Sequence, residues 1–238
     1  STVSRAFMKD GASFTILDIP DSLSSVASGI NNAGQIVGRF QQSPQGFGHG
    51  FLINKGVFTQ IDAPYAGVFE TAAYGINEKG QIVGAFDDFI NGKHGQHGFL
   101  KDGDQFIRFD VPFPDALFTR ATGINDAGQI VGVWQDATSL HGFLKVGDTY
   151  TSTSPFVTGI PFDINDLGQM VGYVIKGGQH GFLQDTNSYT FIDVPGDPTT
   201  AAYGINNKGQ IVGTFHSGGR GFLATPVSSP LVVPINNP

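Results

Sequence analysis

Short apolar runs separated by glycine-containing turns recur along the whole chain. The ten-residue phrase Gly-Ile-Asn-x-x-Gly-Gln-Ile-Val-Gly shows the pattern most clearly, because a turn lies between two apolar strand segments. In such a turn Asn can hydrogen-bond its own backbone, and Gly accepts a positive φ. No segment shows the 3.6-residue period and the caps of a helix. The pattern therefore predicts a nearly all-β protein.

Three phrases repeat in a fixed order, with a spacing of roughly 40–48 residues. The turn phrase, or a close variant, begins at Gly29, Gly75, Gly123, Asp163 and Gly204. A His-Gly-Phe-Leu phrase follows it at His49, His97, His141 and His180, and its fifth copy begins with Arg220. The third phrase ends in Asp-x-Pro, at Asp18, Asp62, Asp110 and Asp193, and is degenerate at 150–155. Each repeat therefore predicts four short strands.

Four strands in a unit of this length are typical of a propeller blade. We predict one domain, residues 1–238, folded as a five-bladed β-propeller of four-stranded antiparallel blades, with residues 225–238 as a tail or linker. The first and last repeats are complementary, because one begins with outer strands and the other lacks a fourth strand. We therefore expect the N- and C-terminal strands to close the ring, with Phe14–Ile19 beside Gly221–Leu223.

Composition removes several classes of function. The chain carries 13 Lys and Arg against 20 Asp and Glu, a net charge of −7, which argues against nucleic acid as a partner. It has no cysteine, so disulfides, thiolate metal sites and a thiol nucleophile are excluded. No apolar run is long enough to insert into a membrane as a helix. We expect a monomer with no cofactor.

The three phrases resemble those of the bacterial extracellular HAF-type repeat family, here with Gly in place of Ala in the His-Gly-Phe variant. The resemblance covers nearly the whole chain and implies a secreted or cell-surface protein. It brings no catalytic residues. The chain begins at Ser1 without a charged and then apolar signal segment, so we expect any export signal to have been removed or never to have been present.

The repeated histidines suggest a metal site, because imidazole is a common metal ligand. However, they lie on the third strand of each blade, so those of different blades should be about 20 Å apart. We therefore interpret them as structural residues within each blade and predict no metal site. The repeated aspartates should be edge charges; a reversed strand order would instead place them around the channel, where they could bind a cation.

Function more often lies where repeats differ, and the long, variable loops should share one face. Charged residues that break the repeat gather in that part of the sequence. The candidate catalytic set is Glu70, Asp88, Asp136, Arg120 and Asp163. Paired carboxylates could hydrolyse a glycosidic bond, with Arg120 holding an anionic or hydroxyl group. The alternative is that these acids are solvated charges or turn caps.

An aromatic residue lies at the end of the second strand in every blade, near the histidine of the third strand. Such a surface could stack on sugar rings once per blade, or the rings could simply pack between blades. The candidate ligand-binding residues are Trp134, Phe86, Phe40, Tyr173 and His216. Of these, Trp134 is the strongest candidate, as the only tryptophan.

Three functions stay open. Regular repeats favour a module that binds a carbohydrate or another surface ligand on the long-loop face. A secreted glycosidase-like hydrolase is the alternative, if the five catalytic candidates converge within about 10 Å around the channel mouth. A structural or protein-interaction module is the third.

Overall fold

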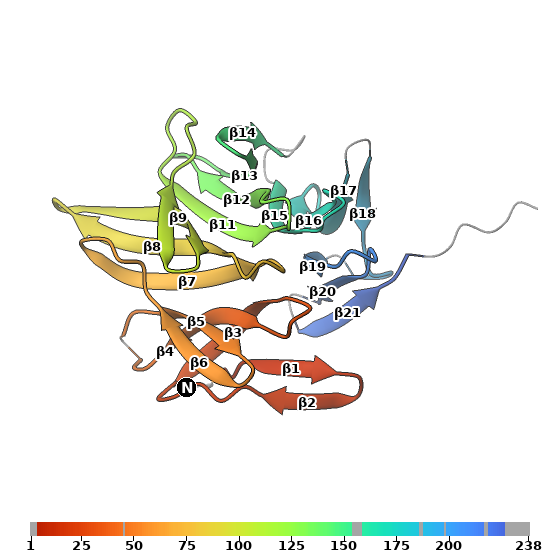
Figure 1. Cartoon of the computed structure of the whole chain (residues 1–238). Helices are drawn as coiled ribbons and strands as arrows, with labels where there is room; N and C mark the ends of the chain where they lie inside the picture. The colour runs from red at the N-terminus through yellow and green to blue at the C-terminus, as the bar shows by residue number, and fades with distance from the viewer. Residues whose placement is uncertain are drawn as a thin grey trace, which may run out of the picture.

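The computed structural model describes residues 4–44, 46–153, 159–185, 188–197, 199–216 and 219–226. Within these ranges the chain forms 21 strands and no helix, which confirms the all-β prediction. The strands form antiparallel sheets set around a central channel (Figure 1). Most of the predicted tail, residues 227–238, and part of the degenerate phrase at 154–155 lie outside the described residues.

Each sheet follows the chain order, from an inner first strand outward. The first three four-stranded sheets are β3 (Ser24–Ile30), β4 (Ile36–Gln41), β5 (His49–Asn54) and β6 (Val57–Ile61); β7 (Val68–Ile76), β8 (Ile82–Ile90), β9 (Lys93–Asp102) and β10 (Gln105–Phe109); and β11 (Phe118–Ile124), β12 (Ile130–Gln135), β13 (Leu140–Val146) and β14 (Thr149–Ser152). The remaining sheets are β15 (Gly159–Ile164), β16 (Met170–Ile175), β17 (Gln179–Gln184) and β18 (Tyr189–Ile192); β19 (Ala201–Ile205), β20 (Ile211–Phe215) and β21 (Arg220–Ala224); and β1 (Phe7–Asp10) with β2 (Ser13–Ile16). A single parallel bridge from β9 to β11 connects the second and third sheets.

The first strand of each blade contains a β-bulge just before its turn, which the sequence pattern did not reveal. In β7 the register shifts between Ala73 and Gly75, so Tyr74 is an extra residue. The same shift occurs in β3, β11, β15 and β19. The bulged residues all line the channel: Ser28, Tyr74, Thr122, Phe162 and Tyr203. Residues that vary between repeats are thereby presented to the channel.

Neighbouring blades pack face to face. Val37 of β4 lies in one apolar cluster with Ala73, Ile76, Ile82 and Phe86 of the next blade. The valines at the equivalent position in the next three blades are also fully buried. The second strand in each blade also approaches the first very closely: a Cβ at Gly84 would lie 2.0 Å from the carbonyl oxygen of Ala72. This contact explains the repeated glycine after Ile-Val.

The turn asparagines form both the turn and the link between blades. Asn77 Oδ1 accepts a hydrogen bond from the Gln81 amide at 3.0 Å, as the sequence predicts for a turn. Its Nδ2 donates to the carbonyl oxygen of Asn125, in the next blade, at 3.1 Å. The same bond runs from Asn31 to Asn77, from Asn125 to Asn165 and from Asn165 to Asn206. We call these five residues, Asn31, Asn77, Asn125, Asn165 and Asn206, the asparagine belt.

The termini do not pair as predicted. Within the described residues β2 pairs only with β1, in the register Phe7↔Ile16, and β21 pairs only with β20. Closure of the ring by Phe14–Ile19 beside Gly221–Leu223 is therefore not what the structure shows. The physical reason is local: a tight turn at Gly11, with φ of 55°, folds β1 back on β2 and satisfies that edge of β2 first.

Candidate functional site

A polar pocket of about 350 Å³ lies at the long-loop end of the channel, between the first three blades. We call it the channel-mouth pocket. Its walls come from the first strands β3, β7 and β11, the second strands β4 and β8, and β9. The residues on which its chemistry depends are Arg39, Glu70, Tyr74, Asp87, Gln96 and Arg120. Two guanidinium groups and two carboxylates therefore face one small space.

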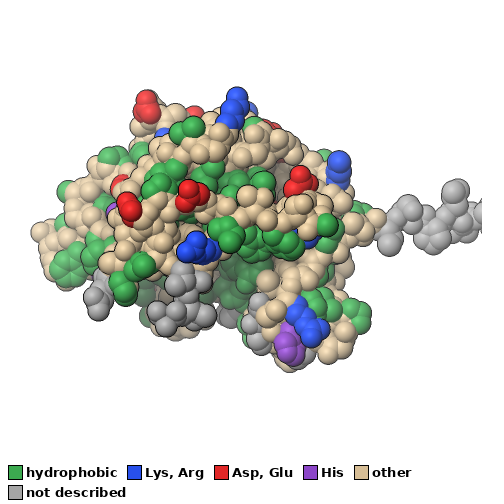
Figure 2. All heavy atoms as spheres, turned by 90° about the horizontal axis from the view of Figure 1, so that it is seen from below, with side chains coloured by type: hydrophobic (Ala, Val, Ile, Leu, Met, Phe, Trp, Pro, Cys, Tyr) green, Lys and Arg blue, Asp and Glu red, His purple; other side chains and the backbone are tan. Residues whose placement is uncertain are grey.

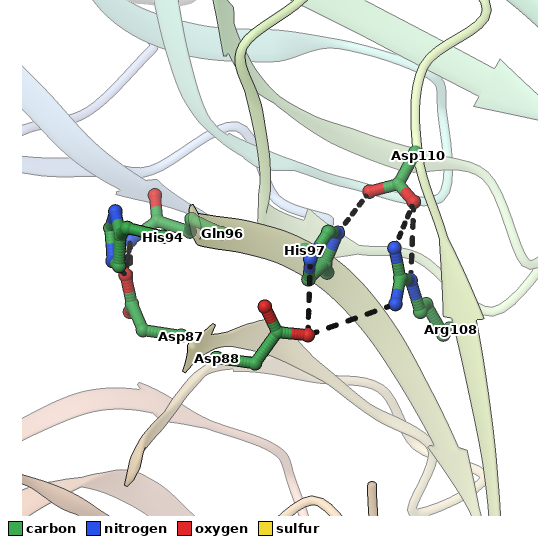
Figure 3. Close-up of polar contacts among 7 residues, drawn as sticks. All are labelled: Asp87, Asp88, His94, Gln96, His97, Arg108 and Asp110. Carbon is green, nitrogen blue, oxygen red and sulfur yellow. Dashed lines mark hydrogen bonds and ion pairs between the residues drawn. The ribbon is translucent and has the colours of Figure 1, made fainter. Parts of the chain in front are cut away.

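Both carboxylates in this pocket already have partners. Asp87 accepts hydrogen bonds from Gln96 Nε2, at 3.1 Å to each oxygen, and contacts His94 Nε2 at 2.9 Å (Figure 3). Glu70 Oε1 lies 3.8 Å from Arg39 Nη1, in a partly exposed ion pair. Their negative charges are therefore engaged within the protein.

Arg120 is the charged group of the pocket that has no counterion among the described residues. Its Nη2 donates to Gln96 Oε1 at 3.1 Å, and its guanidinium lies 5.7 Å from the ring centre of Tyr74 and 5.8 Å from that of Phe118. Its Nε is buried and has no hydrogen-bond partner in the described part of the chain. No carboxylate among the described residues forms an ion pair with it. A cation held by two rings and a neutral amide suits an incoming anionic group.

The five catalytic candidates do not gather in one place. Glu70 and Arg120 line the channel-mouth pocket, whereas Asp88, Asp136 and Asp163 do not. Asp88 and Asp87 are neighbours on β8, so their side chains point to opposite faces of the sheet (Figure 3). Asp163 lies on β15, among the residues around the wide opposite part of the channel.

Asp88 belongs to a separate ionic cluster on the second blade. Its carboxylate is buried, with Oδ2 3.4 Å from His97 Nε2 and 3.8 Å from Arg108 Nη1 (Figure 3). His97 Nδ1 contacts Asp110 at 2.7 Å, and Arg108 also pairs with Asp110. Burial by itself raises the pKa of Asp110, but the His97 and Arg108 contacts outweigh it, and the pKa is lowered.

Asp136 caps the loop after β12. It accepts hydrogen bonds from the amides of Thr138 and Ser139, at 2.7 and 2.8 Å, and contacts His141 Nε2 at 2.8 Å. The hydrogen bonds with Thr138 are the main cause that holds the pKa of Asp136 far below its usual range. Its role in the structure is that of a turn cap.

The repeated histidines find partners within their own blades. Each contacts an aspartate of the same blade at hydrogen-bond distance: His49 with Asp62, His97 with Asp110, His141 with Asp136 and His180 with Asp193. In the described residues no three acidic or histidine side chains are grouped so that they could hold a metal ion. No described helix could span a membrane.

The aromatic candidates fall into two groups. Phe40, Phe86 and Trp134 are buried and pack against neighbouring rings; Trp134, for example, lies 4.3 Å from His141 and 4.9 Å from Phe113, centre to centre. A ring without an exposed face cannot stack on a sugar, and none of these three residues lines the pocket. Tyr173 is half-buried beside Phe162, and His216 is exposed, 3.4 Å from Asp197.

Sequence reasoning missed Arg39, Tyr74 and Gln96 of the pocket, and of the adjacent acids Asp87 and Asp88 it selected Asp88, which does not line the pocket. A signal existed for Arg39, since the equivalent positions are Ala85, Val133, Tyr173 and Thr214, none of them charged. Tyr74 faces the channel only because of the bulge. Which of Asp87 and Asp88 would face the pocket depends on the register of β8.

Four-stranded antiparallel sheets, packed face to face around a channel with their first strands innermost, are the architecture of a β-propeller. No family model matches the chain, and no curated protein matches it. Among solved structures it is similar to TolB from Acinetobacter baumannii, a β-propeller protein, with a TM-score of 0.59 and 12% identity over 87% of this chain and 54% of that one. It spans about half the length of TolB. A protein assigned as a candidate gluconolactonase aligns at 14% identity over 85% of this chain and 74% of that chain, with a TM-score of 0.45.

Proposed function

We propose that this chain is a secreted or cell-surface ligand-binding β-propeller module of the bacterial HAF-type repeat family. Its ligand is an acidic carbohydrate, or another surface ligand with a carboxylate, bound at the channel-mouth pocket. The order and sequence of the three repeated phrases support the family and its location. The observation that carries the ligand class is Arg120, a guanidinium at the pocket with no counterion among the described residues.

A carboxylate in this pocket would complete the bonding of Arg120. The Tyr74 and Phe118 rings already hold the guanidinium, so its side chain loses little freedom when a ligand binds. Arg39 and Glu70 at the rim are exposed enough to exchange their weak mutual contact for hydroxyl groups of a sugar. The acidic surface of the chain as a whole disfavours non-specific attraction of anions, so binding depends on this local arrangement.

Calorimetry with tri-galacturonate and the neutral trisaccharide maltotriose tests the proposal. We expect saturable binding of the acidic sugar only, weakened about 10- to 100-fold in Arg120→Gln, because a charge-assisted hydrogen bond is lost. The matched control is Arg220→Gln, an exposed arginine on β21 outside the pocket, which should bind normally. The proposal fails if the folded wild-type protein binds neither sugar, or if Arg120→Gln binds as well as the control.

A further inference from the structure

Within the described residues, the last blade has a surface that no neighbouring blade covers. At the four regular interfaces the valine of each second strand, Val37, Val83, Val131 or Val171, is 0% exposed. The equivalent Val212 of β20 is 50% exposed, and Leu223 beside it on β21 is 63% exposed. The last sheet therefore presents to solvent the face that every other sheet buries.

A matching surface lies on the first blade. The isoleucine at the end of the first strand is nearly buried in the other blades, at 8% in Ile76 and 3% in Ile164, but Ile30 of β3 is 57% exposed. The wide part of the channel, a cavity of about 700 Å³, has Ile30 on one wall and Val212 and Leu223 on another. We call the gap between these two walls the seam. In the view from below, hydrophobic side chains gather in a hollow of the surface (Figure 2).

The N-terminal hairpin shows what is missing from the seam. β1 and β2 occupy the place of the third and fourth strands of a blade that precedes β3. The Ser25 amide donates to the Ser4 carbonyl at 2.9 Å, as the Thr71 amide donates to Gly48 between the next two blades. Met8 and Ile19 pack against Ile36, Phe40 and Phe51 of the first blade. Within the described residues the other edge of β1 pairs with no strand.

The asparagine belt is open at the same place. Asn206 Nδ2 donates to Gln210 Oε1 but, in the part of the chain described, to no asparagine carbonyl of a following blade. At the other end, no belt asparagine among the described residues donates to the Asn31 carbonyl. Within the described residues, the last blade therefore has a belt donor and the first blade a belt acceptor that make no belt bond, and a further turn of the same kind would supply both partners.

We propose that the seam binds a further β-hairpin of the repeat type Gly-Ile-Asn-x-x-Gly-Gln-Ile-Val-Gly. Its second strand would pair with the free edge of β1, as β8 pairs with β9, and complete a four-stranded blade with β1 and β2. Its valine would cover Ile30, and its opposite face would cover Val212 and Leu223.

The seam could also be closed by β20 pairing directly with β1, and the structure disfavours this. The edge of β20 is already occupied by β21 along five residue pairs, from Ile211↔Ala224 to Phe215↔Arg220. Closure would require those pairs to break, whereas an incoming hairpin leaves every observed pair intact. Arg120, on which the proposed ligand binding depends, does not line the seam.

The first test measures binding of a labelled synthetic peptide with the sequence of residues 71–87, which form most of β7 and β8. We expect saturable one-to-one binding by fluorescence anisotropy. Ile30→Asp or Val212→Asp in the protein should weaken it at least about 10-fold, since each places a charge in the apolar contact. The matched control is Val57→Asp, at a 65% exposed position on the outer strand β6, and it should bind the peptide as tightly as the wild-type protein does. A peptide with Val83→Asp should not bind.

A short hairpin is marginally stable alone, so the same peptide is also fused through a Gly/Ser linker ahead of Ser1. We expect this fusion, and not one with a scrambled peptide, to raise the unfolding midpoint and to slow amide exchange at Phe7 and Met8. The proposal is overturned if neither form of the peptide binds or stabilises, or if Ile30→Asp and Val212→Asp bind like the control. It is also overturned if Met8→Cys/Val212→Cys forms a disulfide spontaneously in the free chain, because that bond places β1 against β20.

Discussion

Asp163 is the residue that departs most from its repeat, since the other four turn phrases begin with glycine. Its two carboxylate oxygens accept hydrogen bonds from the amides of Ile164 and, in the next blade, Ile205, both at 2.9 Å. Burial raises the pKa of Asp163 to about 6, although both hydrogen bonds lower it. A residue proposed for catalysis thus connects two blades, and its energetic effect is on stability.

The stability of the protein should therefore depend on pH through Asp163. The pKa in the folded state, about 6, is above the 3.8 of the unfolded chain, so the protonated carboxyl stabilises the fold at low pH. This contribution is complete below about pH 3.8 and is lost as the pH rises through about 6. Between pH 4 and 7 the free energy of unfolding of the wild-type protein should fall by about 1–3 kcal/mol relative to that of Asp163→Asn.

Urea unfolding of the two proteins at a series of pH values measures this difference. The aspartates whose pKa is lowered, such as Asp110 and Asp197, act in the opposite direction but are present in both proteins, so their effects cancel. If the free energies of unfolding of the two proteins change with pH in parallel, ionising Asp163 does not destabilise the fold and the expectation is wrong.

The sequence could indicate which single residues were unusual but not where they would meet. Glu70 and Arg120 stood out as departures from the repeat, and both line the pocket. Asp136 stood out equally but caps its own loop. The difference depends on side-chain direction at strand ends, which bulges and loop conformations determine and the repeat pattern does not encode.

At the scale of strands and turns, the repeated phrases were sufficient to predict almost every element. The turn asparagines were predicted to stabilise their own turns, and they do. Their second bond, to the carbonyl of the next blade, could not be predicted, because it needs the relative position of two blades. A side chain that is both turn former and connector explains why the phrase is repeated so closely.

Loss of one belt residue should therefore cost more inside the belt than at its end. Asn77→Ala removes a buried side chain that bonds its own turn and the Asn125 carbonyl, so we expect a loss of about 1–3 kcal/mol in the free energy of unfolding. Asn206→Ala is the matched control, because Asn206 forms the same turn but no described bond to a following blade. Its loss should be clearly smaller.

Chemical denaturation of the two variants gives both values. Asn77→Asp adds a second comparison, because it retains the acceptor for the Gln81 amide but removes the Nδ2 donor to Gln81 Oε1 and to the Asn125 carbonyl, and adds a charge. Equal losses in Asn77→Ala and Asn206→Ala would mean that the inter-blade bond contributes nothing measurable.

At the scale of the whole molecule, the sequence predicted antiparallel sheets in the right order along the chain. It did not predict how the first and last sheets are arranged. Blade number and closure depend on the angle between packed blades, a property of many contacts that no single phrase determines. The structure shows the last and first sheets each with an uncovered face. Stability should therefore be uneven around the channel.

Amide hydrogen exchange should reveal this unevenness. We expect amides of β20 and β21 to exchange faster than those of β8 and β12, which lie between two neighbouring blades, because opening at the seam breaks fewer apolar contacts. Mass spectrometry of peptic fragments resolves these segments. Uniform protection around the molecule would instead indicate that the chain opens as a single unit and that the seam is not a weak point.

The links of the asparagine belt all run in one direction, and this has a consequence for how such a chain can grow. Each turn gives a donor to the next and receives one from the previous, like the head-to-tail bond of a polymer. A duplicated repeat inserted in frame would bring its own donor and acceptor, so the series would remain bonded on both sides of the insertion. The bonds between blades therefore set the order and polarity of the repeats, whereas the wedge shape of the packed side chains sets how many of them fit around one axis.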